Sequence, residues 1–459
     1  MPTIFSAGAA SSQGFGSQLA PLAPFNIGVG NTFQGAQATA VDSSSNQIFA
    51  TLDPNNGRNF ILKIDPFGSV LWSYDYGGNC TPLGLACDSN NNIYITYTTS
   101  IFSSDPCIMK LTTNGTFVAA THFNVTTAGY SNLSLNSRIA IDSSGNIYVS
   151  GYGVAASSAS VAVMTKFDSS LAITWSNAFT YTTGATTNNV CNDHAVDASG
   201  NVFMLNQALL TSSGFYITYV TKLASNGSVS ASCVLNVSAS LVSQCIGIDS
   251  IGNVFLVAFN VLNSIYKLTN SLGTLSAQLN LNGPDASSAT NNMSFTIAPD
   301  NTVYMQSNGT YTVSPYGSRQ GAFLGSISNT LTNYKGITIN VDAGSGTNSL
   351  VSATYGRSPT FFNNVLYIPF NTATTTNGQQ PSFGRIPVSY FSASGTYTSQ
   401  VISNNTFRLY AGLSPFTSSP GVTLSAATSS AATWAMYNIG FTESQFPPGF
   451  TVDSGYFTS

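Results

Sequence analysis

The sequence has very little charge. Charged residues make up 6% of its 459 residues, whereas an ordinary soluble domain has about 25%. Glutamate, a strong helix former, occurs only at Glu443. Polarity comes instead from Ser, Thr, Asn and Gly, which favour turns and strands over helices. The composition therefore predicts an all-β fold.

Other absences exclude several classes of partner. The net charge of −4 is small and scattered, so we expect no nucleic-acid partner. No apolar run approaches the roughly 20 residues that cross a bilayer, so we expect no membrane insertion. The first basic residue is Arg58, so the N-terminus lacks the basic region of a secretory signal.

Cysteine is also scarce, and its spacing carries no metal-binding or redox motif. None of the six cysteines forms a CxxC pair, and Cys87, Cys107 and Cys245 fall in apolar, strand-like runs. We interpret them as buried thiols, with one disulfide pair as the alternative.

What the sequence does have is a repeat. The phrase AIDSSGNIYVSG, from Ala140, has four near-copies, and the aspartates of successive copies lie 46, 54, 55 and 52 residues apart. Each copy is followed by a second phrase that ends a strand in lysine, such as IMKLTTNGTFVA from Ile108. One unit thus holds four strands in about fifty residues, which is typical of a propeller blade. The aspartates are Asp42, Asp88, Asp142, Asp197 and Asp249, and the lysines are Lys63, Lys110, Lys166, Lys222 and Lys267.

Two weaker copies follow. The sixth has Ala298 at the aspartate position and Ser314 at the lysine position, and the seventh has Phe361 and Arg385 there. We therefore predict a β-propeller of four-stranded blades, with seven blades favoured and six as the alternative.

The repeat also suggests a domain organisation. We expect an N-terminal docking arm over residues 1–23, a β-propeller over 24–400 and a β-rich C-terminal extension over 401–459. The segment before Asp42 resembles the end of a blade, so we expect an N-terminal strand to complete the last blade and close the ring. The two ends are almost uncharged, which suits segments that dock onto partner subunits.

The aspartate and lysine positions are the candidate site residues. Five blades keep both charges and the sixth loses both, which favours a partly buried ion pair within each blade or between neighbours. We predict a structural role for these residues, because removing one partner of such a pair leaves the other charge buried and uncompensated. That loss lowers the free energy of unfolding by about 3–5 kcal/mol. Arg385 is included, although its aspartate position holds Phe361.

Two functional alternatives at these positions are less favoured. The cations could line a channel that binds an anionic ligand, and the DSSGN turns could bind calcium. The turns lack the further carboxylates of a calcium loop, so we expect the Asp and Asn side chains to cap their own turn. We predict no metal site and no cofactor.

No motif indicates catalysis. The only histidines are His122 and His194, and no G-x-S-x-G elbow supplies an activated serine. We interpret both histidines as neutral strand residues, and Trp72 and Trp175, nine residues after their lysines, as blade packing. The sequence thus predicts a protein that is not an enzyme.

The two phrases resemble the bacterial β-propeller repeats of the SBBP type, which are related to the NHL-like propellers. The resemblance covers residues 37–320 well and 320–400 poorly, and it implies the propeller fold. The opening MPTIFSAGAASSQGFGSQ resembles the N-termini of tailed-phage virion proteins. That second resemblance implies an extracellular particle protein that needs no secretion signal.

These observations lead to a functional prediction. We expect a non-enzymatic virion structural protein, either a tail fibre, a tail-associated or a capsid-exposed protein, located in the virion. Its partners would be other virion proteins, copies of itself and a host-surface glycan or receptor bound through loops that vary between blades, such as TTSIFSSDPC from Thr98. The main alternative is a secreted or cell-surface propeller that binds glycans or proteins, and the third is a propeller lyase or lactonase.

Overall fold

The structure is a computed structural model, and the residues that it describes form strands almost throughout. It describes residues 25–26, 423–425 and 34–413, apart from connecting segments within the last range. Those segments are 54–57, 67–69, 79, 100–105, 123–129, 156–158, 180–185, 237–239, 260–262, 282–292, 314–316, 333, 344–347, 350, 354–358, 375–377, 393–394 and 403–404. Within the described residues, the one helix is the short 3-10 helix η5 (Val388–Ser392). None of these residues belongs to a helix of the length and hydropathy that crossing a membrane requires.

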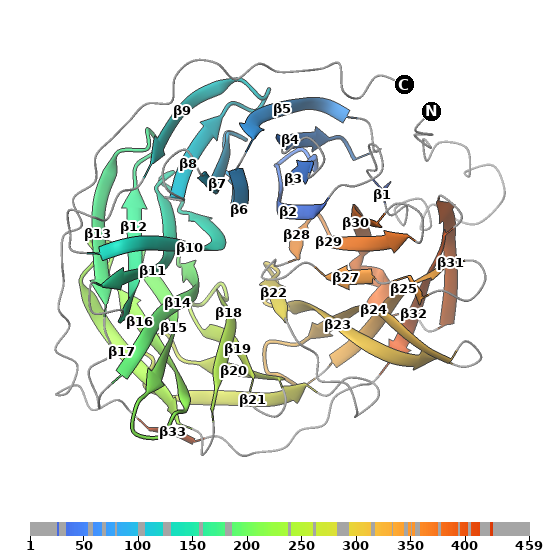
Figure 1. Ribbon diagram of the computed structural model, residues 1–459. Helices are drawn as coiled ribbons and strands as arrows, with labels where there is room; N and C mark the ends of the chain where they lie inside the picture. Colours follow the sequence, from blue (N-terminus) through green and yellow to red (C-terminus); the bar gives the residue numbers. More distant parts are fainter. Residues whose placement is uncertain are drawn as a thin grey trace. The chain divides into compact units, whose positions relative to one another are not determined.

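The described strands form seven antiparallel sheets, and the fold is that of a seven-bladed β-propeller (Figure 1). This confirms the all-β prediction with seven blades rather than six. The chain divides into two compact units, one comprising Met1–Pro82, Asn282–Phe416 and Gly449–Ser459, the other Leu83–Leu281 and Thr417–Pro448.

Unit two contains blades two to five, each with four strands joined in sequence order. Blade two is β6 (Cys80–Cys87, of which residues 80–82 belong to unit one), β7 (Ile93–Thr99), β8 (Pro106–Leu111) and β9 (Phe117–His122). Blade three is β10 (Tyr130–Ile141), β11 (Ile147–Ala155), β12 (Ser160–Phe167) and β13 (Ile173–Phe179). Blade four is β14 (Thr186–Val196), β15 (Val202–Leu210), β16 (Tyr216–Leu223) and β17 (Val229–Asn236). Blade five is β18 (Val242–Ile248), β19 (Val254–Phe259), β20 (Asn263–Leu268) and β21 (Leu275–Leu281).

Unit one contains blades one, six and seven. Blade one is β2 (Gln34–Val41), β3 (Gln47–Asp53), β4 (Arg58–Ile64) and β5 (Val70–Gly78). Blade six is β22 (Ser294–Ile297), β23 (Val303–Val313), β24 (Gly317–Ile327) and β25 (Tyr334–Ala343), with β26 (Asn348–Ser349) beside β25. Blade seven is β27 (Val351–Ala353) and β28 (Thr360–Phe362), both paired with β29 (Val365–Thr374), followed by β30 (Gly378–Pro387).

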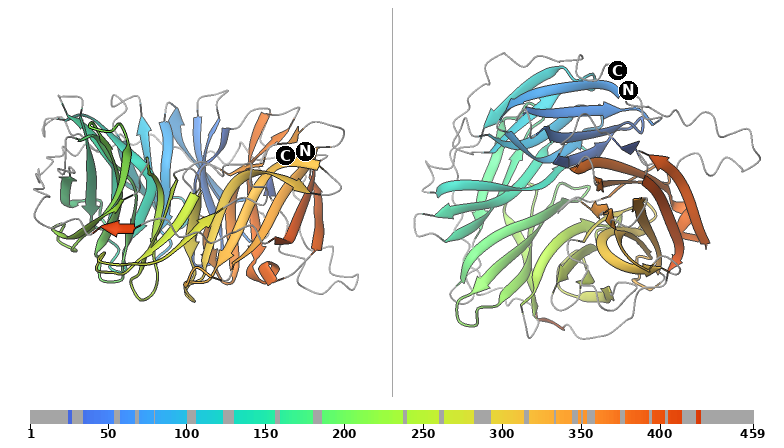
Figure 2. Two further views of the ribbon diagram at one scale, coloured as in Figure 1. Left: turned by 90° about the horizontal axis from the view of Figure 1, so that it is seen from below. Right: turned by 45° about the vertical axis from the view of Figure 1, so that its right-hand side comes forward.

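The N-terminal strand completes blade seven, as the sequence predicts. Strand β1 (Phe25–Asn26) pairs antiparallel with β30, Phe25 lying opposite Phe383. The C-terminal region adds strands to two other blades. β31 (Gly395–Ile402) and β32 (Asn405–Leu413) extend blade six through β25, and the turned views show them beside that sheet (Figure 2). β33 (Thr423–Ser425) pairs with β17 of blade four.

The core lies between the sheets, because side chains on both faces of the middle strands are buried. Every residue of β12 is buried, and one apolar cluster combines Tyr94 and Ile108 of blade two with Ile147, Val163 and Phe167 of blade three. Blades therefore bury their faces against their neighbours, which a single four-stranded sheet could not do alone.

The glycine that ends the repeated phrase has a specific structural role in blade three. Gly151 lies opposite Leu135, and a Cβ atom at Gly151 would meet the backbone oxygen of Ser134 at 1.9 Å. The close approach of β10 to β11 at this point precedes a β-bulge between Leu135 and Ile139. Such bulges redirect side chains, and this one carries Asn136 and Arg138.

We predict that Gly151→Ala destabilises the protein by at least about 3 kcal/mol, because the clash is with backbone and not with a movable side chain. Urea unfolding measured by near-UV circular dichroism tests this. Gly273→Ala is the matched control, since its Cβ would meet only the Ser271 Oγ at 3.5 Å. Equal midpoints for the two variants would contradict the assigned role.

Candidate functional site

The repeated aspartates close the turn between the first two strands of each blade. In blade three, Oδ1 of Asp142 accepts the backbone N–H groups of Ser144 and Asn146 at 2.9 Å, and Oδ2 accepts the Asn146 amide at 2.8 Å. The same side-chain bonds recur at Asp42, Asp88, Asp197 and Asp249. Gly145, at φ +80°, supplies the left-handed residue of the turn. The predicted Asx capping is therefore present in all five blades.

Both carboxylate oxygens of each aspartate thus accept hydrogen bonds from donors within the turn. Although burial opposes it, hydrogen bonds from Asn146, Tyr148 and Ser144 lower the pKa of Asp142 below its ordinary value. In the described part of the chain, no group of three or more His, Cys, Asp or Glu side chains lies together as a metal site would require.

The lysines contact their own aspartate in only two of the five blades. In blade one, Lys63 Nζ lies 2.8 Å from Asp42 Oδ2, and the two side chains are 4% and 1% exposed. In blade five, Lys267 Nζ lies 4.0 Å from Asp249 Oδ2. Although burial opposes it, hydrogen bonds from Lys63 and Asn46 lower the pKa of Asp42.

In blades two to four, the lysine reaches the next blade instead. Lys110 Nζ donates to the Ser169 carbonyl at 2.8 Å and Lys166 Nζ to the Ser225 carbonyl at 3.4 Å. Lys222 Nζ donates to the Asn270 carbonyl at 3.4 Å and also to its side-chain oxygen. The prediction of an ion pair within each blade or between neighbours thus holds in blades one and five. It is corrected in blades two to four, where a backbone carbonyl of the neighbouring turn accepts the bond.

Each of these ammonium groups also lies over an aromatic ring of its own blade. The distance from Nζ to the ring centroid is 5.3 Å for Lys166 over Tyr148 and 5.1 to 5.2 Å in three other blades. Lys166, Trp175 and Asn177 together hold one turn of blade four. Trp175 Nε1 donates to the Ser225 carbonyl at 3.1 Å, and Asn177 Nδ2 to the Gly227 carbonyl at 3.0 Å. The interpretation of Trp175 as blade packing is confirmed.

The sixth and seventh blades complete the comparison. Ala298 is buried, and its turn is held by backbone bonds and by Asp300 Oδ1, which accepts the Thr302 N–H at 2.9 Å. The lysine position of blade six is Ser326, opposite Tyr304 in the strand register, so the assignment to Ser314 is wrong.

In blade seven, Phe361 stacks on Tyr304 of blade six with ring centroids 5.5 Å apart. Arg385 lies opposite Tyr367, as the repeat predicts, and its side chain is outside the described residues.

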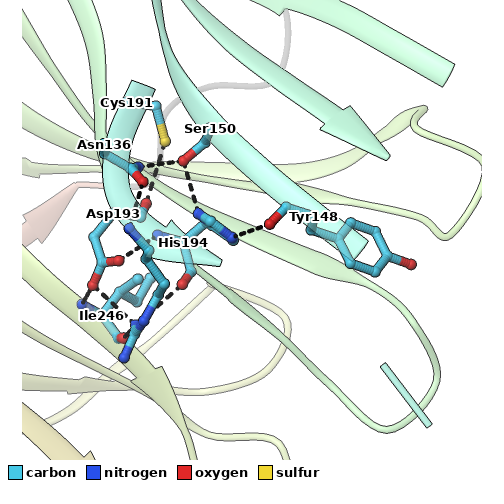
Figure 3. A network of polar contacts seen from close by, with 8 residues as sticks. Asn136, Tyr148, Ser150, Cys191, Asp193, His194 and Ile246 are labelled. Atoms are coloured by element: carbon cyan, nitrogen blue, oxygen red, sulfur yellow. Dashed lines mark hydrogen bonds and ion pairs between the residues drawn. The ribbon is translucent and has the colours of Figure 1, made fainter. Parts of the chain in front are cut away.

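A second cluster, which the sequence does not reveal, joins the first strands of blades three to five (Figure 3). Arg138 Nη1 of β10 donates to Asp193 Oδ2 of β14 at 3.0 Å and to the carbonyl of Ile246 of β18. Asp193 Oδ2 also accepts the Ile246 N–H at 2.8 Å, and Oδ1 accepts the His194 N–H at 2.9 Å. One guanidinium and one carboxylate thereby connect three blades.

Burial raises the pKa of Asp193, and the Arg138 guanidinium and the backbone donors from Ile246 and His194 oppose that shift. The Arg138 side chain is 26% exposed and that of Asp193 is 9% exposed. Arg138 is therefore the better exposed partner of this ion pair.

His194 is the centre of the second half of this cluster. Its Nδ1 lies 2.7 Å from Ser150 Oγ, and its Nε2 lies 3.2 Å from the Tyr148 carbonyl. The carbonyl can only accept, so Nε2 carries the proton and Ser150 donates to Nδ1. Asn136 Nδ2 donates to the same Ser150 oxygen, and Cys191 Sγ donates to the Asp193 carbonyl at 3.2 Å.

This arrangement contains a serine–histidine contact but not a triad. Asp193 bonds Arg138 and not the imidazole ring, and both Ser150 and His194 are fully buried. Burial, with a further contribution from Arg138, lowers the pKa of His194 to about 3. Burial raises the pKa of Cys191 to about 12. In the structure as it stands, the histidine is neutral and the thiol protonated, and the cluster serves to connect blades.

No family model matches the sequence, and no curated protein matches it. Solved structures match at the level of fold. An ulvan lyase of polysaccharide lyase family PL25 aligns with a TM-score of 0.50 and 10% identity over 78% of this chain and 93% of that chain. The β-propeller domain of the Trilobed protease from Pyrococcus furiosus aligns at 0.44 and 8% identity, over 78% and 96% of the two chains. A puromycin hydrolase S511A mutant aligns at 0.46 and 9% identity, over 81% and 58%.

The similarity to the ulvan lyase contradicts the prediction that the chain is not an enzyme. The propeller fold that it shares with the ulvan lyase is a fold on which catalysis occurs. A missing sequence motif is therefore no ground for excluding an activity, and that prediction is withdrawn. At these identities, the similarity shows the fold alone.

The two kinds of lysine contact give different expected costs. Lys63→Met strands the buried Asp42 carboxylate and should cost about 3–5 kcal/mol. Lys166→Met removes a long bond to a carbonyl and a cation–π contact, and should cost about 1–2 kcal/mol. Urea unfolding of both variants measures the difference. Equal costs would contradict the distinction between ion-paired and carbonyl-bound lysines.

His194 predicts a specific pH dependence of stability. Its pKa is about 3 in the folded chain and about 6.5 when unfolded. The folded state thus binds fewer protons, so this contribution is complete above pH 6.5 and is lost as the pH falls toward 3. The loss is on the order of 4 kcal/mol. We expect His194→Gln to lower stability at pH 7 but to lose less of it by pH 4, as measured by urea unfolding. Parallel pH profiles would contradict this.

Proposed function

We propose that this chain is a structural protein of a virion, in which the β-propeller is a scaffold displayed on the exterior of the particle. It would be a tail fibre, a tail-associated or a capsid-exposed protein, and its partners would be other virion proteins and copies of itself. Loops that vary between blades would bind a host-surface glycan or receptor. Phe215, in the loop between β15 and β16 of blade four, is an exposed aromatic side chain in such a loop.

The observation that carries this proposal over its main alternative is the state of the cysteines. All six, which lie within the described part of the chain, are thiols and not disulfides, and five of them are buried. Proteins that fold in oxidising compartments tend to convert cysteines into disulfides. Buried thiols favour a chain that folds in a reducing cytoplasm and is released by lysis. They argue against a propeller exported as a secreted or cell-surface protein.

The composition supports the same proposal. The chain carries 6% charged residues. A chain so poor in charge suits a permanent assembly better than a transient complex. The proposal does not depend on whether the propeller also has a catalytic activity.

We expect antibodies raised against this chain to label intact, purified virus particles from the source culture at symmetric positions in negative-stain images. Mass spectrometry of the same particles should find the chain with its cysteines reactive to alkylation after denaturation, without prior reduction. An antibody that labels cell surfaces or the particle-free medium would support the secreted alternative and contradict the proposal.

A further inference from the structure

The connection between β15 and β16 of blade four presents an aromatic ring to solvent. Its residues, Thr211 to Phe215, are all exposed, and Phe215 is 45% exposed. A phenyl ring that stays in water adds little to the stability of the fold, whereas aromatic side chains are enriched in binding surfaces. Phe215 is therefore a candidate contact residue.

Hydrogen bonds hold the backbone of this loop in one shape. The Leu210 N–H donates to the Phe215 carbonyl at 3.0 Å, and the Gly214 N–H donates to the Leu210 carbonyl at 2.8 Å. Ser213 Oγ accepts the Phe215 N–H at 3.3 Å. The backbone that carries the ring is thus ordered before any ligand arrives, which lowers the entropy cost of binding.

The residue after Phe215 is anchored to the segment that leads into blade five. The Tyr216 N–H donates to Ser240 Oγ at 3.0 Å, and the Tyr216 carbonyl accepts the Leu241 N–H at 2.8 Å. Thr218 Oγ1 donates to the Leu241 carbonyl at 2.9 Å. The loop is therefore fixed at both of its ends.

The surface next to the loop combines apolar and polar side chains. Leu209 lies opposite Tyr216 in one register and opposite Thr187 in the other, so these three residues share one face of blade four. All three are half-buried, and Asn188, the next residue of β14, is exposed. Together with Phe215, these four residues are the Phe215 site. It offers apolar contact beside groups that donate and accept hydrogen bonds.

The segments that build this site carry no charge. The described residues 186–192, 207–218 and 240–244 contain no Lys, Arg, His, Asp or Glu. A carboxylate or sulfate group of a ligand would find no cation in these segments, and its lost hydration would not be compensated. An uncharged ligand fits them better.

The small exposed area favours a saccharide over a folded protein. A stable protein interface uses about 20–30 residues on each side, whereas this loop exposes five consecutive residues. The C–H groups on the apolar face of a sugar ring are attracted to the electron-rich face of a phenyl ring. The sugar hydroxyls match the hydroxyl and amide groups of Thr187, Asn188 and Tyr216.

We propose that the Phe215 site binds an uncharged glycan, with Phe215 stacking on a sugar ring. This inference rests on the proposed attachment to a host surface and deepens it, since it names the blade, the loop and the class of glycan. A single site of this size binds weakly, and many copies of the chain on one particle would supply the avidity.

Fluorescent beads that each carry many copies of the full chain test this proposal on an array of neutral, sialylated and sulfated oligosaccharides. We expect the beads to bind neutral oligosaccharides, and to do so equally at about 0.05 M and about 1 M NaCl, because no ion pair contributes. Phe215→Ala should lower the signal about tenfold or more. Phe117→Ala is the matched control and should bind like the wild type, since it removes a phenyl ring that is 37% exposed at the start of β9.

Three results would overturn the proposal. One is binding to acidic oligosaccharides that high salt abolishes, and another is an equal signal from Phe215→Ala and the wild type. The third is the absence of glycan binding, both on the array and on cells of the source culture, where periodate oxidation of surface sugars should remove it. Antibody labelling of virus particles depends on none of these results, so this inference and the virion proposal can fail separately.

Discussion

In each of the first five blades, one aspartate carboxylate closes the turn between the first two strands by accepting two backbone N–H groups and an asparagine amide. This turn fixes the residue at which β10 ends and β11 begins, and the corresponding turns do the same for the first two strands of the other four blades. It thereby sets the register of each sheet. The same carboxylate accepts the tyrosine hydroxyl two residues beyond that asparagine in blades two and three, at 3.2 and 2.9 Å. The ring so positioned is the one over which the lysine lies.

Because charge is scarce, the buried charges of the described residues that form ion pairs carry much of the specific contact between side chains. Lys63 compensates a buried carboxylate, and Arg138 compensates another while bonding a carbonyl of a third blade. Buried ionic groups of this kind add little net stability compared with apolar packing, but losing one partner is costly. The physical role of the Arg138–Asp193 pair is to fix how neighbouring blades of unit two meet, which a smooth apolar interface would specify less tightly.

The sequence predicts the parts of this structure that rest on local contacts. The Asp-led turns, the strand order in blades one to five and the packing role of Trp175 follow from residues close together in the repeat. The lysine contacts of blades two to four could not be predicted, because a backbone carbonyl of the next blade accepts each bond and leaves no residue signature. Blade six misled the alignment because β23 and β24 are both 11 residues long, which moves the lysine position to Ser326. The contact between Ser150 of β11 and His194 of β14 could not be predicted either, because the two residues are 44 positions apart in the sequence. Bulges in β14 and in β10, the partner of β11, also interrupt the regular register there.

Since the acceptors for Lys110 and Lys166 are main-chain oxygens, the side chains at Ser169 and Ser225 are not needed to bind lysine. Substitution at these two positions therefore leaves the lysine contacts intact, whereas substitution of Asp42, or of Asn270 with its side-chain acceptor for Lys222, does not. The sequence of these turns can thus vary among related proteins while the lysines keep neighbouring blades in the same arrangement. As the repeat diverges in sequence, we therefore expect substitutions at the turn residues first and at the lysines last.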